Sequence, residues 1–516
     1  MTLDNNKYRK QLFKHLDGIT IIPTILAIDQ LGILDFMNKH SSFYIDDIIN
    51  NHTVSKGYLN IALRNLLSID ILSINNLEKY SENKQYHVNH KNLNSIKKAL
   101  KNNNFNNLIS IYLDFVNIIN NKIIIKDNRF DLIYDIITNI KEFQKDTNFD
   151  YNLYYYIEGL LLGPILSYLG FLNISFKTIE NKEMHELITT ILKSSGLIDD
   201  KLELTDKGIF FNKRITSYGV TTSYLPLLKN LDQLISKKDN LVWRRDDKGY
   251  ELHVNRKMNV WGSGGSHEFY FKKIDNIIRD IFNKDIDTQP RGIIDIGCGD
   301  GTFLKHCYDI IINETLRSKY IEKYPLKLIG VDINKAARIA SRRKLNKNNI
   351  DNIIINGNIS DPDNLNKTLK HEYNENLDSF ISTRTFLDHN RIYAKPKEIK
   401  NYNIKTTGAF CYKGNLVNNT QIINNLIEHF TNWKKHVNKH GLIILELHTI
   451  CPELIRDNIG STIACAYDTT HGFSDQYLIE YDVFIKCVEY AGLRLENDSI
   501  LFPNKNIPTI SINYFK

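Results

Sequence analysis

The chain has 516 residues, of which 42% are hydrophobic and 24% are charged. This composition is that of an ordinary globular protein and argues against a disordered or fibrous one, while the length predicts roughly two to four domains. Lys and Arg exceed Asp and Glu by only 66 − 59 = +7, without a sustained basic run, so the charge does not indicate a nucleic-acid partner.

The N-terminal residues 1–18 contain no apolar stretch that could serve as a signal sequence. No later window reaches the ~18 uninterrupted apolar residues of a membrane span. The six cysteines form no CxxC pair, so the sequence suggests neither a zinc site nor a disulfide framework. We therefore expect a cytoplasmic protein with free thiols and no membrane partner.

A repeated phrase in the N-terminal half predicts a duplicated helical unit. Pro23–Ile28 and the residues after it resemble Gly163–Ser167 and the residues after that segment. A second helix follows each phrase, over 62–72 and 189–198, and then a polar strand, at 86–88 and 202–204. Each copy therefore has the order helix, helix and wing, which is typical of a winged-helix unit.

Winged-helix units often bind DNA, but these two do not have the charge for it. The expected recognition helices, Val54–Ile69 and Lys182–Ser194, carry few basic residues at exposed positions and could not neutralise many phosphates. A packing or lid role is therefore favoured. Between the copies, Phe105–Phe143 has Ile, Leu and aromatic residues at helical spacing, which predicts a core or dimer-forming helix pair.

From residue 291 onward, apolar runs alternate with amphipathic segments, which is the pattern of a parallel sheet covered by helices. The fold class expected for this part is α/β. The predicted strands are Gly292–Ile296, Lys327–Val331, Asn352–Asn356, Ser379–Ser382 and Leu442–Leu447. A last helix over Tyr477–Ala491 and an edge strand over Thr509–Phe515 would complete the sheet.

The first predicted strand runs into a glycine-rich turn that opens a helix, with Gly297, Gly299 and Gly301 at alternate positions. Only glycine lets the backbone press against a ligand at such a turn. Asp295 lies two positions before the first glycine, where its carboxylate could hold the ammonium of a methionine moiety and would repel a pyrophosphate. The pattern therefore favours S-adenosylmethionine (SAM) over NAD.

Two further strand ends supply the rest of a SAM site. Asp332 follows the second strand, where its two oxygens can accept hydrogen bonds from both ribose hydroxyls, and Ile333 lies beside it. Asn358 and Ile359 follow the third strand, where adenine needs an edge partner and a face. The set resembles the class I methyltransferase superfamily, with Asn358 at a position where Asp is commoner. The wide spacing before Asp332 predicts a longer first helix, over 310–322.

Three phrases outside this turn carry a closer resemblance, His253–His267, Arg384–Arg391 and His471–Tyr477. They resemble the methyltransferase domains of polyketide synthase loading modules of the apratoxin synthase type. The resemblance covers roughly residues 215–516, and more loosely the helical N-terminal half as the family's lid. It implies methyl transfer to the α-carbon of a malonyl-type acyl group on a carrier-protein phosphopantetheine. Some members of the family use a single iron or manganese ion.

The expected architecture is a C-terminal Rossmann-like class I methyltransferase sheet over residues 251–516. A largely helical lid region with two winged-helix-like units, over 1–100 and 101–250, would precede it. The chain has no acyl carrier motif, so an acyl carrier protein would have to be a separate partner. A small-molecule O-methyltransferase is the alternative, because such enzymes join winged helical domains to the same sheet. A non-catalytic SAM-binding module is a third possibility, although the intact glycines argue against it.

Methylation of carbon requires removal of an α-proton and stabilisation of the enolate, and so a base or a metal. His448 follows the strand that ends at residue 447, where it is either functional or a hydrogen-bonded strand-end histidine. Arg384, Asp388 and His389 follow another strand end. They would bind an acyl carboxylate or orient the enolate, unless they only form ion pairs that stabilise the loop.

His471 and Gln476 lie in a segment rich in Gly, Ser and Asp before the last helix. An imidazole and an amide oxygen could share one divalent cation there, with His448 as the third ligand and Asp468 or Glu446 as alternatives. The competing interpretation is a loop held by hydrogen bonds. The sequence therefore leaves the metal site as a hypothesis.

Overall fold

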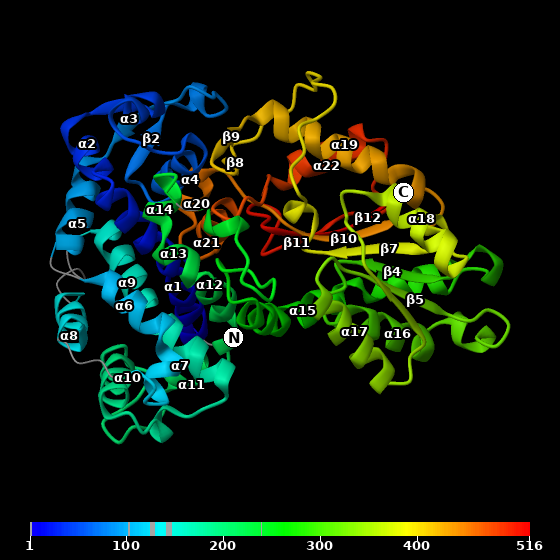
Figure 1. Ribbon diagram of the computed structural model, residues 1–516, viewed down its shortest axis with the longest axis horizontal. Coiled ribbons are helices and arrows are strands. Elements are labelled where there is room, and N and C mark those ends of the chain that lie inside the picture. Colours follow the sequence, from blue (N-terminus) through cyan, green and yellow to red (C-terminus); the bar gives the residue numbers. More distant parts are fainter. Residues whose placement is uncertain (1–2, 102–103, 124–128, 141–146, 239) are drawn as a thin grey trace. The chain divides into compact units, whose positions relative to one another are not determined.

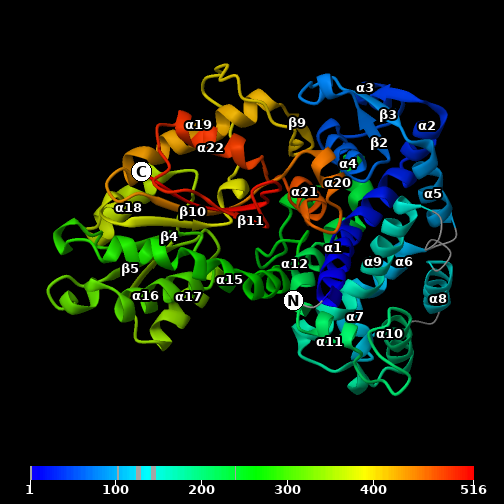
Figure 2. The same cartoon turned by 180° about the vertical axis from the view of Figure 1, so that it is seen from behind.

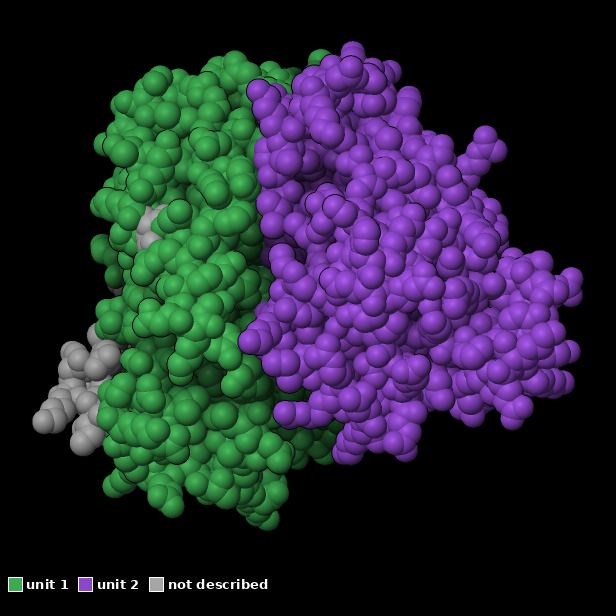
Figure 3. Space-filling model, turned by 45° about the vertical axis from the view of Figure 1, so that its right-hand side comes forward, with its two compact units in different colours: residues 1–266, 409–417, 451–475 green, residues 267–408, 418–450, 476–516 purple. Residues whose placement is uncertain are grey.

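The computed structural model describes residues 3–101, 104–123, 129–140, 147–238 and 240–516 (Figure 1). The chain forms two compact units, which are coloured separately in Figure 3. Unit 1 comprises residues 1–266, 409–417 and 451–475, and unit 2 comprises 267–408, 418–450 and 476–516. Unit 1 therefore includes two short segments from the C-terminal half of the chain. The domain boundaries expected at residues 100 and 250 stay a prediction.

The first part of unit 1 is a helical bundle with a small antiparallel sheet, in the strand order β1-β3-β2. Its elements are α1 (Leu3–Gln30), α2 (Ile33–Lys39), β1 (Ser42–Tyr44), α3 (Ile45–Asn51), α4 (Lys56–Ser68), β2 (Leu72–Ile74), β3 (Gln85–Val88) and α5 (His90–Lys101). The strand expected at 86–88 is present as β3, so the first copy of the repeat has its wing.

The rest of unit 1 is also helical. Its elements are α6 (Phe105–Leu113), α7 (Phe115–Ile119), α8 (Arg129–Asn139), α9 (Asn148–Leu172), α10 (Lys182–Ser194), α11 (Asp206–Asn212), α12 (Gly219–Ser223), α13 (Leu225–Lys229), α14 (Leu231–Ile235), the hairpin β8 (Phe410–Tyr412) and β9 (Asn415–Val417), α20 (Pro452–Asp457) and α21 (Ala464–Gly472). The wing of the second copy is reduced to one bridge, between Ile198 and Leu204. A helix pair was expected over 105–143, and the structure instead has the three helices α6, α7 and α8 up to residue 139. Residues 124–128 and 141–143 of this segment lie outside the described ranges.

The two repeated phrases lie in the long helices α1 and α9, which contain Pro23 and Pro164 and run side by side (Figure 1, Figure 2). The helices touch where each has a glycine. A Cβ on Gly18 would lie 2.1 Å from the backbone oxygen of Tyr156, and one on Gly159 would lie 2.4 Å from the Cα of His15. No larger residue fits at this crossing without a shift of the backbone.

Helix α9 is long and apolar enough to cross a membrane by composition, and α1 with α2 passes the same test as a bent pair. The most apolar window of α9 is 78% buried. Burial of this kind is expected of a core helix that packs on several neighbours.

Unit 2 contains a seven-stranded sheet in the order β11-β12-β10-β7-β4-β5-β6. Its strands are β4 (Gly292–Ile296), β5 (Lys327–Val331), β6 (Asn352–Ile355), β7 (Ile381–Thr385), β10 (Leu442–Leu447), β11 (Ile500–Phe502) and β12 (Ile510–Phe515). The pairs from β6 to β10 are parallel, while β12 runs antiparallel to both of its neighbours. The predicted α/β class is confirmed.

Helices cover both faces of this sheet. Helices α16 (Thr302–Glu314) and α17 (Lys335–Lys347) lie on one face, and α18 (Pro362–Tyr373), α19 (Asn419–Val437) and α22 (Tyr481–Tyr490) lie on the other (Figure 1). Helix α15 (Arg256–Phe282) precedes the first strand, and the boundary between the units falls within it.

Three expectations about unit 2 need correction. The strand over 510–515 is not at the edge, because β11 pairs with its outer side. Strand β7 begins only at Ile381, because 377–379 forms a 3-10 turn. The first helix ends at Glu314, and a separate 3-10 turn over 316–320 follows. This turn is held by the buried Arg317 guanidinium, which donates to the backbone oxygens of Pro290 and Tyr324.

The α1 and α9 crossing gives a test of the packing of unit 1. We expect Gly159→Ala to lower the free energy of unfolding by about 1 to 3 kcal/mol, the usual range for overpacking. The measurement is urea unfolding followed by circular dichroism. The matched control is Gly264→Ala in helix α15, where an added Cβ meets nothing within 4 Å. There the better helix propensity of alanine should leave stability equal or higher by up to about 1 kcal/mol. Equal stability of both variants would contradict the close crossing.

Candidate active site

The residues that follow the parallel strands of unit 2 meet at one edge of the sheet. Because neighbouring strands β5, β4, β7 and β10 run in the same direction, their carboxyl ends lie side by side. Ligands of open α/β sheets bind at this edge. The glycine turn follows β4, Asp332 follows β5, His389 lies just after β7 and Glu446 lies at the end of β10.

The glycine turn has the backbone that its sequence predicts. Gly297, Gly299 and Gly301 all have a positive φ, at 79°, 53° and 80°. A Cβ on Gly299 would meet nothing within 4 Å, so that the backbone here is open to a ligand. The backbone N–H of Gly299 donates to Oδ2 of Asp332 over 3.1 Å, and the N–H of Asn334 donates to Oδ1 over 2.7 Å. Asp332 therefore ties the glycine turn to the end of β5.

Asp295 is buried at the start of the turn and is only partly satisfied. Its Oδ1 accepts a hydrogen bond from the Thr383 hydroxyl over 2.9 Å, while Oδ2 has no partner among the described residues. Burial raises the pKa of Asp295 to about 7, and the nearby Asp332 adds to the rise while the Thr383 hydrogen bond opposes it. A buried carboxylate oxygen without a donor suits a cationic group such as the ammonium of SAM.

Asn358 and Ile359 were expected around adenine, and Ile333 beside the ribose residue Asp332; these three residues differ in exposure and in hydrogen bonding. Ile333 is 63% exposed beside Asp332, whereas Ile359 is buried. The backbone oxygen of Ile359 accepts from the indole of Trp433, and the Oδ1 of Asn358 accepts from the N–H of Ser360. The geometry therefore favours Ile333 over Ile359 as the apolar face for adenine. With the orphaned Asp295 oxygen and the open Gly299 backbone, the residues present fit SAM.

The polar centre of the edge is a buried pair of side chains from two neighbouring strand ends. The Nδ1 of His389 lies 2.5 Å from Oε1 of Glu446, and the backbone N–H of His389 donates to Oε2 over 3.1 Å. Both side chains are almost completely buried. A carboxylate that holds one imidazole nitrogen fixes the tautomer and leaves the basic lone pair on the other nitrogen, Nε2.

Arg384 and Asp388 form a second buried pair near the end of β7. The guanidinium of Arg384 pairs with Asp388 over 2.5 Å, and both are inaccessible to solvent. His429, on α19, shares the same carboxylate oxygen over 2.9 Å. Sequence analysis did not single out His429, because a histidine within an amphipathic helix looks like any other polar residue of a half-buried face.

The metal hypothesis is not supported. Among the residues that the structure describes, no group of three or more His, Cys, Asp and Glu side chains could hold a metal ion. His448 is fully buried, with its Nε2 2.7 Å from the hydroxyl of Ser511 and its ring against Phe484. Burial lowers the pKa of His448 to about 3, so it is neutral. Gln476 is also buried in unit 2, whereas His471 is counted with unit 1.

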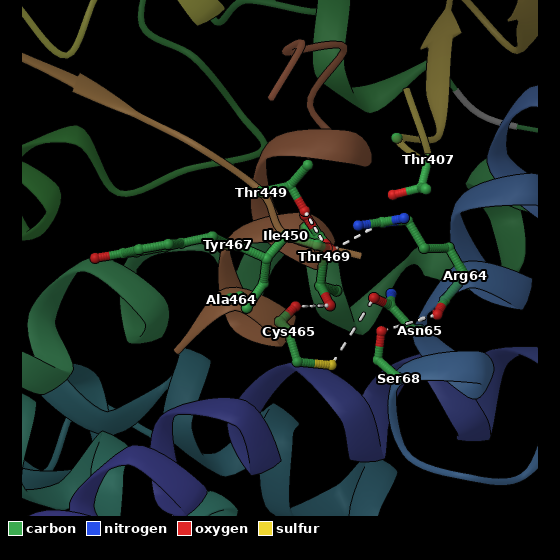
Figure 4. A network of polar contacts seen from close by, with 12 residues as sticks. Arg64, Asn65, Ser68, Thr407, Thr449, Ile450, Ala464, Cys465, Tyr467 and Thr469 are labelled. Atoms are coloured by element: carbon green, nitrogen blue, oxygen red, sulfur yellow. Dashed lines mark hydrogen bonds and ion pairs between the residues drawn. The ribbon is translucent and has the colours of Figure 1, made fainter. Parts of the chain in front are cut away.

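His471 belongs to helix α21, which is tied to α4 within unit 1. Asp468 pairs with the buried Arg64 over 2.9 Å. The thiol of Cys465 faces the Oδ1 of Asn65 at 4.0 Å (Figure 4). His471 itself donates from Nδ1 to the backbone oxygen of Tyr467, one turn earlier, over 2.9 Å. Helix α21 therefore packs against α4, and Asp468, which was an alternative metal ligand in the sequence analysis, pairs with Arg64 instead.

Comparison with known families decides the class of protein. A family model described as the AprA MT2-like domain matches residues 251–513, just over half of the chain. The chain belongs to this family. Models described as the AprA N-terminal domain and the AprA winged helix domain match residues 8–74 and 158–238. The protein is therefore a class I SAM-dependent methyltransferase of the AprA type, with a helical N-terminal region that includes a winged helix domain.

Several solved structures resemble the chain at low identity. LepI in complex with SAM is 11% identical over 76% of this chain and 94% of its own, with a TM-score of 0.41. An O-methyltransferase family 2 protein from Planctomyces limnophilus in complex with apigenin is 9% identical over 99% and 94%, with a TM-score of 0.36. The DszA carbon methyltransferase is 10% identical over 64% and 78%, with a TM-score of 0.34. No curated protein gives a match.

The raised pKa of Asp295 predicts that SAM affinity depends on pH. The ammonium of SAM prefers the ionised carboxylate, and below about pH 7 a proton competes for it, so the affinity should fall by up to about tenfold per pH unit. Calorimetric titrations between about pH 6 and about pH 7.5, where the ammonium itself stays largely protonated, measure the slope. In Asp295→Asn the affinity should be weaker and independent of pH. A flat profile in the unaltered protein would show that Asp295 does not receive the ammonium.

Proposed function

We propose that this methyltransferase transfers its methyl group to carbon, and that the acceptor is the α-carbon of a malonyl-type acyl thioester on a carrier protein. The observation that carries the proposal is the buried His389 and Glu446 pair at the edge where the cofactor residues lie. A carbon acid must lose a proton before it can attack a methyl group, and an imidazole oriented by a carboxylate is a suitable base.

In the proposed reaction, one set of residues binds SAM and a second set removes the α-proton. Asp295, the glycine turn and Asp332 would hold SAM, which supplies an electrophilic methyl group when bound. Glu446 holds the Nδ1–H of His389, so that Nε2 can take the α-proton of the acceptor. The electron pair left on the α-carbon would form the new carbon–carbon bond as the bond between the methyl group and the sulfonium sulfur breaks, with S-adenosylhomocysteine as the leaving group. The proton stays on the imidazole, where the adjacent carboxylate stabilises the charge.

A carrier protein is proposed as the partner because the proposed acceptor is a thioester on carrier-protein phosphopantetheine. We place the reaction in the cytoplasm, in keeping with six cysteines that are all free thiols. The competing acceptor is a phenol or another small-molecule hydroxyl, which an oriented imidazole could also deprotonate.

A substrate panel separates these acceptors. The purified protein is incubated with methyl-labelled SAM and with malonyl, methylmalonyl and acetyl thioesters on a carrier protein, alongside free phenols, and product masses are followed. Methylation of the malonyl carrier thioester on carbon is the expected result. Methylation of a phenol with no turnover of any thioester would contradict the proposal.

Removal of the base should abolish turnover without loss of the cofactor. We expect His389→Gln and Glu446→Gln to lower kcat by about 10²- to 10⁴-fold, the usual contribution of a general base, while the Kd for SAM stays unchanged. The matched control is His436→Gln, because His436 is a buried histidine of the same unit that pairs with Asp363 instead. Full turnover of both variants would exclude the pair as the base.

A further inference from the structure

We infer that Arg384, Asp388 and His429 are positioning residues, which never touch the acceptor and hold the loop that carries His389 at the edge of the sheet. The inference rests on the proposed role of His389 as the base. In this role Arg384 and Asp388 do not bind an acyl carboxylate. His429, which the sequence analysis did not single out, acts with them.

Arg384 lies too deep to meet a substrate. Its side chain is 0% exposed and lies between strand β7 and helix α19. The guanidinium carbon is 4.0 Å from the ring centroid of Trp433 and 5.9 Å from that of Phe430, both on α19. Adjacent strand residues point to opposite faces of a sheet, and the preceding Thr383 bonds to Asp295 of the cofactor site. Arg384 therefore points away from that site, into the interface with α19.

Asp388 connects this interface to the base. Its Oδ1 accepts from Arg384 and from Nε2 of His429. Its backbone oxygen accepts from Nη1 of Arg391 over 2.9 Å, and Nε of Arg391 donates to Asn425, also on α19. The residue directly before His389 is thus fixed through both its side chain and its backbone.

The charge states make these bonds strong. Burial lowers the pKa of His429 to about 4, so the ring is neutral and can donate a single N–H to Asp388. Burial by itself would raise the pKa of Asp388, but Arg384 and His429 outweigh this effect and lower it to about 2. At neutral pH the carboxylate of Asp388 is ionised and receives one charged and one neutral donor.

The loop needs such an anchor because its backbone is strained. Phe386, which directly follows β7, has φ at +55°, a region that bulky residues rarely occupy. A bulky residue in this region is energetically unfavourable and persists only where its surroundings hold it. Its backbone N–H is bonded to Leu445 on β10 over 2.7 Å. The strained residue therefore lies between the end of β7 and the anchored Asp388.

Stability alone does not explain this set of side chains. A buried ion pair contributes little net stability compared with apolar residues of the same shape. Nε and Nη2 of Arg384 and Oδ2 of Asp388 also have no partner among the described residues, which adds a desolvation penalty. Polar groups that are costly for the fold and lie beside an active site indicate a functional constraint.

The orientation of His389 depends on two anchors, one on strand β10 and one on helix α19. Glu446 on β10 holds its imidazole and its backbone N–H, and Asp388 is held from α19. The backbone oxygen of His389 accepts from the N–H of Tyr477 over 2.8 Å. Loss of the α19 anchor should leave the pair with Glu446 in place but allow the loop to move relative to the acceptor.

A pair of variants at His429 tests the inference. In His429→Asn the amide is too short to reach Asp388, and kcat should fall by about 10- to 100-fold, as for a small displacement of a catalytic group. In His429→Gln the longer amide restores the donor, and kcat should return to within about threefold of the unaltered enzyme. KM for the acceptor and Kd for SAM should be unchanged in both. The control is His436→Asn on the same helix, which should leave kcat unchanged.

Asp388→Asn provides a second variant of nearly unchanged shape, in case His429→Asn fails to fold. It should lower kcat in the same range with unchanged KM. Wild-type turnover of Asp388→Asn or of His429→Asn, or a raised KM with unchanged kcat, would overturn the inference. If His389→Gln remains fully active, the proposed base is wrong as well. If His389→Gln is inactive while the network variants are unaffected, only the positioning role is excluded.

Discussion

The parallel pairing of β7 with β4 on one side and β10 on the other is the constraint on which the site depends. It places the ends of three strands next to one another, so that Asp295, His389 and Glu446 come from distant parts of the sequence to one edge. The candidate cofactor residues and the proposed base thereby share one rigid support. Asp295, His389 and Glu446 are then fixed by hydrogen bonds between neighbouring strand ends, and Arg384 is fixed by packing against α19.

The strand and glycine turn of the candidate cofactor site could be predicted from the sequence because their signals are local. The turn has a positive φ at Gly297, Gly299 and Gly301, which glycine adopts most readily, and the apolar run before it predicts a buried strand. The pairing of His389 with Glu446 could not be predicted, because it depends on the order of the strands and joins residues that are 57 apart in the chain. His429 gave no signal, since nothing in the sequence of α19 shows that it faces a buried aspartate.

The metal site expected from the sequence was not supported, because residues that are close in the sequence belong to different units. His448, His471 and Gln476 lie close to one another in the sequence, but residues 451–475 are counted with unit 1. Asp475 explains part of this assignment, because its Oδ2 accepts from the Trp243 indole over 2.6 Å and from the backbone N–H of Lys413 over 2.8 Å. Two segments that interrupt the methyltransferase sheet in sequence are thereby joined to the helical unit, which no local pattern reveals.

The proposed function requires that the methyl group replaces one α-proton of a carbon acid. The most direct measurement uses a malonyl carrier thioester with two deuterium atoms on the α-carbon, incubated with the enzyme and SAM, and the mass of the methylated product. Transfer to carbon gives a product that gains one methyl group and loses one deuterium, and this is the expected result. A methylated product that retains both deuterium atoms would show transfer to oxygen and exclude carbon as the acceptor.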